Sequence, residues 1–169
     1  MISRAPEQLF FDEDQKIPNS RLPVLVYRDV SFENADTAAG FERLFTGNHW
    51  PAVWRDVIFD FHHYHSTAHE VLGVASGAAR VKLGGEMGQE ITVASGDVLV
   101  LPAGTGHCCV EQSDDFLVVG AYPSNQSQYD IQRADHAELK AAKLRIAEVP
   151  LPVADPVTGA SGALMRIWT

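Results

Sequence analysis

Between residues 53 and 122 the chain consists of short apolar or alternating runs, each closed by a turn signal. The turn signals are rich in glycine and serine, as in Ser76-Gly77, Gly84-Gly85 and Ser95-Gly96. Several short strands separated by tight turns are typical of an antiparallel sandwich or barrel, and they disfavour parallel βαβ units. We therefore predict an all-β fold with strands over 53–65, 70–75, 79–83, 90–93, 97–101, 107–111 and 116–122.

The segment before this region, residues 1–52, is predicted to be an arm followed by a short helix. Residues 1–35 contain three prolines and one β-prone run, 22–27, so most of the arm is expected to be irregular. A helix is predicted over 36–45, because Asp36 can cap its N-terminus and its apolar residues can share one face.

The segment after this region, residues 123–169, is predicted to hold a second helix and a tail. The helix is expected over 135–149, because Asp135 and Glu138 have the spacing of a capping box. The tail is punctuated by prolines and ends in an apolar run. No internal repeat or long linker divides the sequence, so we expect residues 1–169 to form one domain with its barrel at 53–122.

The charge balance excludes some classes of partner. The 13 Lys and Arg residues are outnumbered by 22 Asp and Glu residues, giving a formal net charge of −9. A chain this acidic, with no basic cluster, is a poor ligand for phosphate backbones, so neither nucleic acid nor a membrane is expected as a partner. No apolar run approaches the ~20 residues of a transmembrane helix. The N-terminus also lacks an apolar stretch of signal-peptide length, so we expect a cytoplasmic protein.

Five of the seven histidines lie in two short segments, and strand parity sorts them. Successive side chains of a strand point to opposite faces. One face of the predicted strand 53–65 carries Val57, Phe59, Phe61, His63 and His65. This set is apolar until its last two members, as expected where an inward-facing strand leaves the packed core and reaches a polar cavity. His62 and Tyr64 belong to the other face. Glu70, which starts the next strand, and His107, which follows a glycine-containing turn, can reach the same cavity.

Three neutral imidazoles and one carboxylate form a donor set that suits Fe(II), Mn(II), Ni(II), Co(II) or Zn(II). We therefore predict one divalent transition metal per chain, held by His63, His65, Glu70 and His107. The identity of the metal stays open, because most protein sites rank these ions in the same order of affinity, and the supply of each ion in the cell decides which one is bound. The alternative is a polar barrel that keeps this spacing without holding a metal.

The segment with His63, His65 and Glu70 resembles the first motif of the cupin superfamily. That motif opens with glycine and continues as H-x-H, three or four residues, E, six residues, G. The chain has His63-Tyr64-His65, four residues, Glu70, six residues and Gly77. Val57 stands where the opening glycine belongs, which affects a turn and removes no ligand.

The segment with His107 resembles the second cupin motif, which runs G, five residues, P-x-G, two residues, H, three residues, N. The chain has Gly96, Pro102-Ala103-Gly104, His107 and Glu111 at these positions. Glu111 replaces the closing asparagine, a change in the cavity wall that again removes no ligand. The two motifs together cover residues 57–111.

More narrowly, the segments HHYHSTAHEVLGV, GDVLVLPAGTGH, GAYP and DPVTG resemble the YjlB-type cupins of bacteria over nearly the whole chain. The resemblance implies a cupin double-stranded β-helix, a jelly-roll-like antiparallel barrel with short flanking helices, and it implies the metal site. It brings no established reaction. Cupin barrels have open sheet edges that arms or partner subunits commonly cover, so we expect a homodimer, with residues 1–35 or 163–168 as cover.

Several residues near the donor set are candidates for supporting roles. His62 is expected at the surface or at a subunit contact, because parity turns it away from the cavity. His69 is expected to hydrogen-bond to a ligand or to cap the backbone, with direct ligation as an alternative because turns break parity. Tyr64 and Tyr122 are candidates for the cavity wall, with plain packing as the alternative. Trp54 is expected to seal the barrel end or to lie at a dimer contact.

Cys109 and Glu111 share parity with His107, so both are expected to be able to line the cavity. Together with Tyr122 they are the candidates for catalysis. A buried cysteine is more often a small hydrophobe than a nucleophile, so the alternative for Cys109 is simple packing. A carboxylate at a strand end is often solvated, so the alternative for Glu111 is a surface position. Cys108 is adjacent to Cys109, and this spacing cannot close an ordinary disulfide loop.

The leading functional hypothesis is a metal-dependent enzyme that acts on a small polar molecule, with dioxygenase-like oxidoreduction favoured over isomerisation. An apolar inner wall would keep water from the site: Val57, Phe59, Phe61, Leu72, Val81 and Leu83. The second hypothesis is a non-catalytic protein that binds a metal and a small ligand. The preference for oxidoreduction rests on analogy with other proteins of this fold, and one fold can host many activities.

Overall fold

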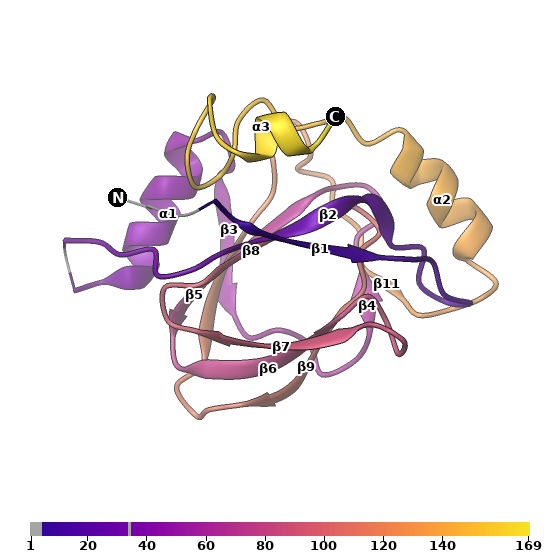
Figure 1. The fold of residues 1–169 in the computed structure, drawn as a ribbon, viewed down its shortest axis with the longest axis horizontal. Helices are drawn as coiled ribbons and strands as arrows, with labels where there is room; N and C mark the ends of the chain where they lie inside the picture. The colour runs from indigo at the N-terminus through magenta and orange to yellow at the C-terminus, as the bar shows by residue number, and fades with distance from the viewer. Residues whose placement is uncertain (1–4, 34) are drawn as a thin grey trace.

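The structure is a computed structural model that describes residues 5–33 and 35–169. Two antiparallel sheets face each other and enclose a barrel, with three short helices outside it (Figure 1). The first four residues of the predicted N-terminal arm lie outside the described part of the chain. The prediction of an all-β antiparallel barrel with short flanking helices is confirmed.

One sheet has six strands in the order β1-β2-β8-β5-β10-β3 and forms the upper layer in Figure 1. Its strands are β1 (Glu7–Phe11), β2 (Ser20–Tyr27), β8 (Val98–Leu101), β5 (Glu70–Ser76), β10 (Leu117–Ala121) and β3 (Ala52–Asp56).

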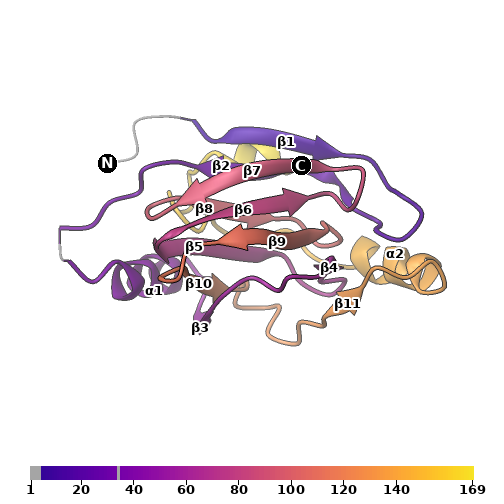
Figure 2. The same cartoon turned by 90° about the horizontal axis from the view of Figure 1, so that it is seen from below.

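The other sheet has five strands in the order β11-β4-β9-β6-β7, seen from below in Figure 2. Its strands are β11 (Gln132–Arg133), β4 (His63–Tyr64), β9 (His107–Gln112), β6 (Ala78–Leu83) and β7 (Gln89–Ala94). The predicted alternation holds in β6, where Val81 and Leu83 are fully buried while Arg80 is exposed. Such alternation is expected of a strand with one face on the core.

Helix α1 (Thr37–Gly47) covers the outer face of the six-stranded sheet, as predicted for residues 36–45. The Asp36 side chain accepts a hydrogen bond from the Ala39 N–H at 3.0 Å and so caps the N-terminus. Phe41 and Phe45 are fully buried against the sheet. Phe41 lies so close to β5 that a Cβ at Gly73 would be 2.7 Å from its ring, which explains a glycine in mid-strand.

The ends of the chain cover the sheet differently from the prediction. The arm contains one strand that was not predicted, because residues 7–11 form β1 and pair with β2 at the sheet edge, while the predicted β-prone run 22–27 lies in β2. Helix α3 (Leu164–Ile167) lies over β2, and Trp168 donates its Nε1–H to the Pro23 carbonyl at 2.9 Å. Both end segments therefore pack on the six-stranded sheet within one chain, and β1 is itself an edge strand.

Two predicted elements were wrong in extent. The strand over 53–65 is broken: β3 ends at Asp56, whose carboxylate accepts the Val57 N–H at 2.8 Å, and the chain then crosses to the other sheet as β4. The second helix, α2 (Leu139–Ala147), begins later than residue 135. Asp135 caps only the Ala137 N–H at 2.9 Å, so the predicted capping box is not formed. Among the helices of the described residues, none is long and apolar enough to cross a membrane.

Candidate metal centre

Three buried histidines meet at one end of the barrel. His63 in β4 and His107 at the start of β9 are direct cross-strand partners, and their ring centroids are 4.0 Å apart. His65 follows β4, two residues after His63. One ring nitrogen from each histidine lies within 4.8 Å of those of the other two. The predicted parity is therefore right at these positions, although the strand that carries them is much shorter than expected.

The turn that leads into His107 depends on glycine. Gly104 has φ +94°, and a Cβ there would contact the Asn19 carbonyl oxygen, so a larger residue would be strained. Its N–H donates to the His65 carbonyl at 2.8 Å, which ties the turn to a second histidine. Gly106 is required for space instead, since Ile17 Cγ2 would lie 2.7 Å from a Cβ there.

A backbone carbonyl fixes the tautomer of each imidazole. The Nδ1 of His63 lies 3.0 Å from the Phe61 carbonyl, and the Nδ1 of His107 lies 3.0 Å from the Thr105 carbonyl. The Nδ1 of His65 makes the same kind of contact with the Asp130 carbonyl. A carbonyl oxygen can only accept, so each Nδ1 carries the proton. In the neutral rings Nε2 then carries no proton, and its lone pair is free to coordinate a metal, as in metal-binding histidines.

Glu70 completes the cluster from the first position of β5. It is 2% exposed, and its Oε1 and Oε2 lie 3.2 Å from His65 Nε2 and 3.1 Å from His107 Nε2. Tyr122 donates its hydroxyl proton to Oε1 at 2.8 Å. Trp54 in turn donates its Nε1–H to the Tyr122 hydroxyl oxygen at 3.1 Å. The carboxylate is thus held from one side by an aromatic hydrogen-bond chain.

The electrostatics of the cluster favour a bound cation. Burial opposes ionisation of Glu70, but His65 and His107 outweigh it and hold the pKa of Glu70 well below its usual range. Burial and the neighbouring His107 lower the pKa of His63 to about 3, so this ring is neutral. For His65, burial lowers the pKa, but the contact with Glu70 outweighs this and raises it overall. A buried carboxylate beside convergent imidazoles therefore attracts positive charge.

The donor set fits a divalent transition metal. Three imidazole nitrogens and one carboxylate are typical ligands of Zn, Fe, Mn, Co and Ni ions. His65 Nε2 and Glu70 Oε2 are buried without a well-directed hydrogen bond, and buried polar atoms of this kind require a partner. A metal ion would satisfy them together.

A cavity of about 210 Å³ opens onto the cluster. It is lined by the four cluster residues together with a mainly aromatic and aliphatic wall: Trp54, Asp56, Val57, Ile58, Phe59, Leu72, Tyr122, Tyr129 and Ile131. Leu72 and Tyr122 were predicted wall residues and do line it. Val57 and Phe59, predicted for the same wall, also line it, but they are 38% and 44% exposed, because the break after β3 places them at the cavity mouth. The other predicted wall residues do not line it: Phe61, Val81 and Leu83.

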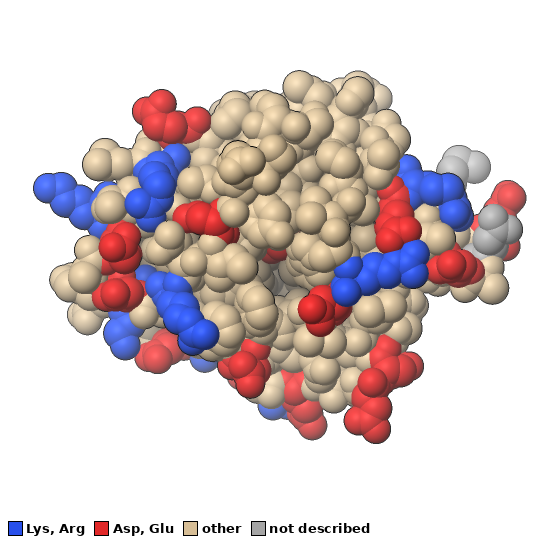
Figure 3. Space-filling view, turned by 180° about the vertical axis from the view of Figure 1, so that it is seen from behind, with Lys and Arg blue, Asp and Glu red and all other residues tan. Residues whose placement is uncertain are grey.

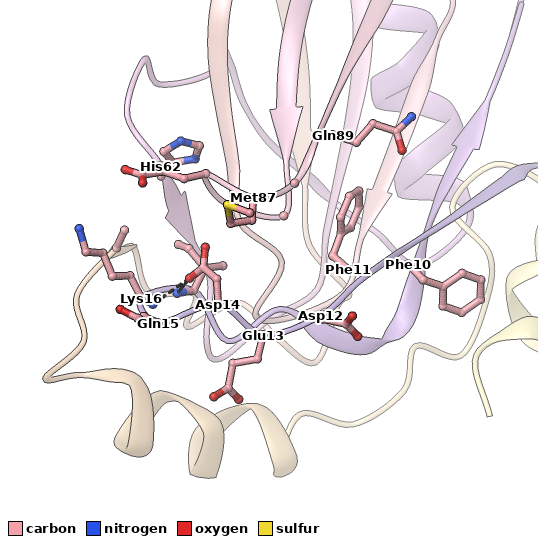
Figure 4. A pocket seen from close by; sticks show the side chains of 15 residues that line it. Phe10, Phe11, Asp12, Glu13, Asp14, Gln15, Lys16, His62, Met87 and Gln89 are labelled. Carbon is pink, nitrogen blue, oxygen red and sulfur yellow. Dashed lines mark hydrogen bonds between the residues drawn. The ribbon is translucent and has the colours of Figure 1, made fainter.

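His62 and His69 lie outside the cluster. His62, just before β4, points into a separate pocket of about 870 Å³ beside the segment 10–17 (Figure 4) and does not line the cavity of the metal centre. His69 is 3% exposed, and its Nδ1 accepts the Ala103 N–H at 2.9 Å. It therefore caps the backbone of the turn that precedes His107, which is one of the roles predicted for it.

Three other candidates do not line the cavity. The Glu111 side chain is 71% exposed and pairs with Arg80 at 3.0 Å, because a register shift in the β6–β9 pairing breaks the expected parity. Cys109 is buried in the core between the sheets, and burial raises its pKa, so it packs as a small hydrophobe. Tyr64 packs in a small core with Ile17, away from the cluster.

Asp130 and Tyr129 contribute to the site and were not predicted. The Asp130 carbonyl holds the His65 ring, and its carboxylate accepts hydrogen bonds from the N–H groups of Ser66 and Thr67 at 2.6 and 3.1 Å. Tyr129 stacks on Tyr122 with ring centroids 3.9 Å apart. Both residues lie in an irregular segment more than 60 positions after His65, and no local signal in the sequence marks them.

Comparisons with known proteins agree with this architecture. Residues 59–119 match the family model described as Cupin domain. Uncharacterized protein YjlB of Bacillus subtilis (strain 168) is 39% identical over 168 residues, which is 99% of each chain. The chain belongs to the cupins, and its relative YjlB places it among the YjlB-type members. The two cupin motifs predicted this membership.

Solved structures that resemble this chain are more distant from it in sequence. Procruciferin, an 11S globulin from Brassica napus, is 16% identical with a TM-score of 0.42, covering 78% of this chain and 33% of its own. Acireductone dioxygenase from Bacillus anthracis is 18% identical with a TM-score of 0.32, covering 63% of this chain and 51% of its own. The present chain thus spans a third to a half of the length of these two proteins.

Proposed function

We propose that this cupin is a metal-dependent enzyme that acts on a small molecule, with dioxygenase-like oxidoreduction as its reaction type. His63, His65, Glu70 and His107 would hold one divalent transition metal. Such a metal, when bound, supplies Lewis-acid or redox chemistry. The observation that carries the proposal is the convergence of three imidazoles, each with its Nδ1 proton engaged, beside a buried carboxylate that His65 and His107 contact.

The chain's own residues support this chemistry by positioning and by excluding water. Tyr122 holds one oxygen of Glu70 and leaves the other facing His107. The Asp130 carbonyl orients His65. The apolar wall, including Leu72 and Ile58, limits the access of water to the cluster.

The choice of oxidoreduction over isomerisation rests on the shortage of proton-transfer groups. Once Glu70 is counted as a ligand, Asp56 is the carboxylate left among the cavity residues. Asp56 is exposed and accepts the Val57 N–H, so it is not desolvated as an efficient catalytic base commonly is. A non-catalytic binding protein is the second candidate, favoured by the burial of Cys109 and by the exposure of Glu111 away from the cavity.

The test is metal analysis of natively purified protein followed by O₂ uptake with a panel of small organic acids, diols and thiols. One equivalent of metal and uptake coupled to one compound support the enzyme. One equivalent of metal with no turnover of any compound supports the binding protein. Absence of metal after native purification, together with failure to take up Zn(II), Fe(II), Mn(II), Co(II) or Ni(II), would overturn both.

A further inference from the structure

Exposed apolar side chains gather at the mouth of the metal-site cavity. Val57, Phe59 and Ile131 are 38%, 44% and 48% exposed, and all three line the cavity. They come from two separate segments: one crosses between the sheets after β3, and the other precedes β11. Apolar groups gathered at one concave opening are a sign of a ligand-contact surface rather than of random exposure.

The wall behind this mouth presents aromatic surface. Tyr122 and Tyr129 stack almost in parallel, with an interplanar angle of 10°. The polar atoms of Trp54 and Tyr122 are already engaged, because the indole N–H donates to the tyrosine hydroxyl and the hydroxyl donates to Glu70. These two side chains therefore offer a ligand mainly apolar contact.

Positive charge is lacking on the side chains of this cavity. Among its lining residues, all in the described part of the chain, none is Lys or Arg, and the acids are Asp56 and Glu70. The nearby Arg133 lies over the face of Phe61, 3.8 Å from the ring centroid, and does not line the cavity. On the face shown in Figure 3, basic side chains are scattered among acidic ones and form no continuous patch. An anionic group away from the metal would therefore lose hydration without gaining a cationic partner.

We infer that the ligand is a compact molecule with two unlike ends: oxygen donors that bind the metal, and an uncharged apolar or aromatic body that contacts the mouth. This inference rests on the proposed metal site and names the substrate class for it. The cavity volume of about 210 Å³ lies below the roughly 300–1,000 Å³ of pockets for drug-sized ligands, so the body is small, about one ring in size. The polar part of the substrate is confined to the metal end.

The test compares three hydroxamates that share one metal-binding head. Zn(II)-loaded protein is titrated with acetohydroxamic acid, benzohydroxamic acid and 4-carboxybenzohydroxamic acid, and binding is followed by calorimetry and by quenching of tryptophan fluorescence. Benzohydroxamic acid is expected to bind about tenfold more tightly than acetohydroxamic acid, because its ring removes additional apolar surface from water. The distal carboxylate is expected to cancel most of that gain. Equal affinity for the first two compounds, or a gain from the carboxylate, would overturn the inference.

A pair of variants assigns the effect to the mouth. Ile131→Asp is expected to reduce benzohydroxamic acid binding about tenfold and to leave acetohydroxamic acid binding nearly unchanged. Leu144→Asp is the matched control, since Leu144 is 67% exposed on α2 and does not line the cavity. Equal effects of the two variants would overturn the assignment. Metal titration comes first: a protein that takes up none of Zn(II), Fe(II), Mn(II), Co(II) and Ni(II) fails the proposed function, whereas a loaded protein with no preference for the ring fails this inference alone.

Discussion

Asp130 gives the sharpest test of how the metal centre is built. Its carboxylate accepts the Ser66 and Thr67 N–H groups, the hydroxyls of the same two residues, and the Gln132 amide at 3.0 Å. Its carbonyl meanwhile holds the His65 ring. The side chain therefore fastens two segments together at the point where one of them orients a proposed ligand.

Replacing Asp130 with Ala removes all the carboxylate bonds and frees two backbone N–H groups. The side chain is 23% exposed, so water can replace some of the lost partners, and we expect a loss of about 3 kcal/mol in the free energy of unfolding. The carbonyl of residue 130, which orients His65, is then no longer held in place by the carboxylate. We therefore expect Zn(II) affinity to fall about tenfold, the lower end of the range for residues that support ligands. Asp130→Asn keeps an acceptor for both N–H groups and is expected to lose about 1 kcal/mol, with a smaller change in affinity.

Urea denaturation of the metal-free protein measures the stability, and competition with a chromogenic chelator measures the Zn(II) affinity. Asp135→Ala is the matched control, because this carboxylate is exposed and accepts the Ala137 N–H locally. It should leave Zn(II) affinity unchanged. A folded Asp130→Ala protein that binds Zn(II) with wild-type affinity would refute the claim that this carboxylate positions His65.

Four further predictions are made, and the last of them, the homodimer, rests on the sequence rather than on the structure. His63→Ala should strip most of the metal, whereas His62→Ala should leave metal content unchanged, and the reverse pattern, by metal analysis, would show the parity to be one residue out of register. Glu70→Gln should retain weakened binding in a Zn(II) titration, because the amide oxygen still coordinates without the charge. Burial lowers the pKa of His69 to about 4, so this residue alone should cost the metal-free protein on the order of 3 kcal/mol between pH 6.5 and pH 4, as the unfolded state takes up this proton first. In urea denaturation, His69→Asn, which keeps an acceptor for the Ala103 N–H, should show a loss over this range that is smaller than that of wild type by about that amount. Sedimentation should give a homodimer at micromolar concentration, and a monomeric mass would contradict this expectation.

Much of the barrel could be predicted because its signals are local. The strands between residues 70 and 121 lie within one or two positions of their predicted ends, since alternating burial and turn glycines are properties of neighbouring residues. The position of Gly104 before His107 belongs to the same class of signal, because its positive φ is a requirement of the turn itself.

The errors come from contacts between distant segments. Nothing within residues 53–65 indicates that the first part pairs with β10 in one sheet and the last part with β9 in the other. For the same reason β1 was missed, since its strand conformation depends on pairing with β2. Glu111 was misplaced because a register shift against β6 is invisible in the sequence of β9 alone.

The proposed metal ligands could be recognised from local spacing: two histidines two residues apart, a carboxylate and a third histidine at cupin spacing. How these groups are held and what faces them depends on contacts between distant segments. The carbonyl of Asp130, the stacked Tyr122 and Tyr129 and the exposed side chain of Ile131 meet the site from separate segments. The physical reason is that the pleat of a strand sets which way a side chain points, whereas its hydrogen-bond and packing partners are chosen by the closure of the whole barrel.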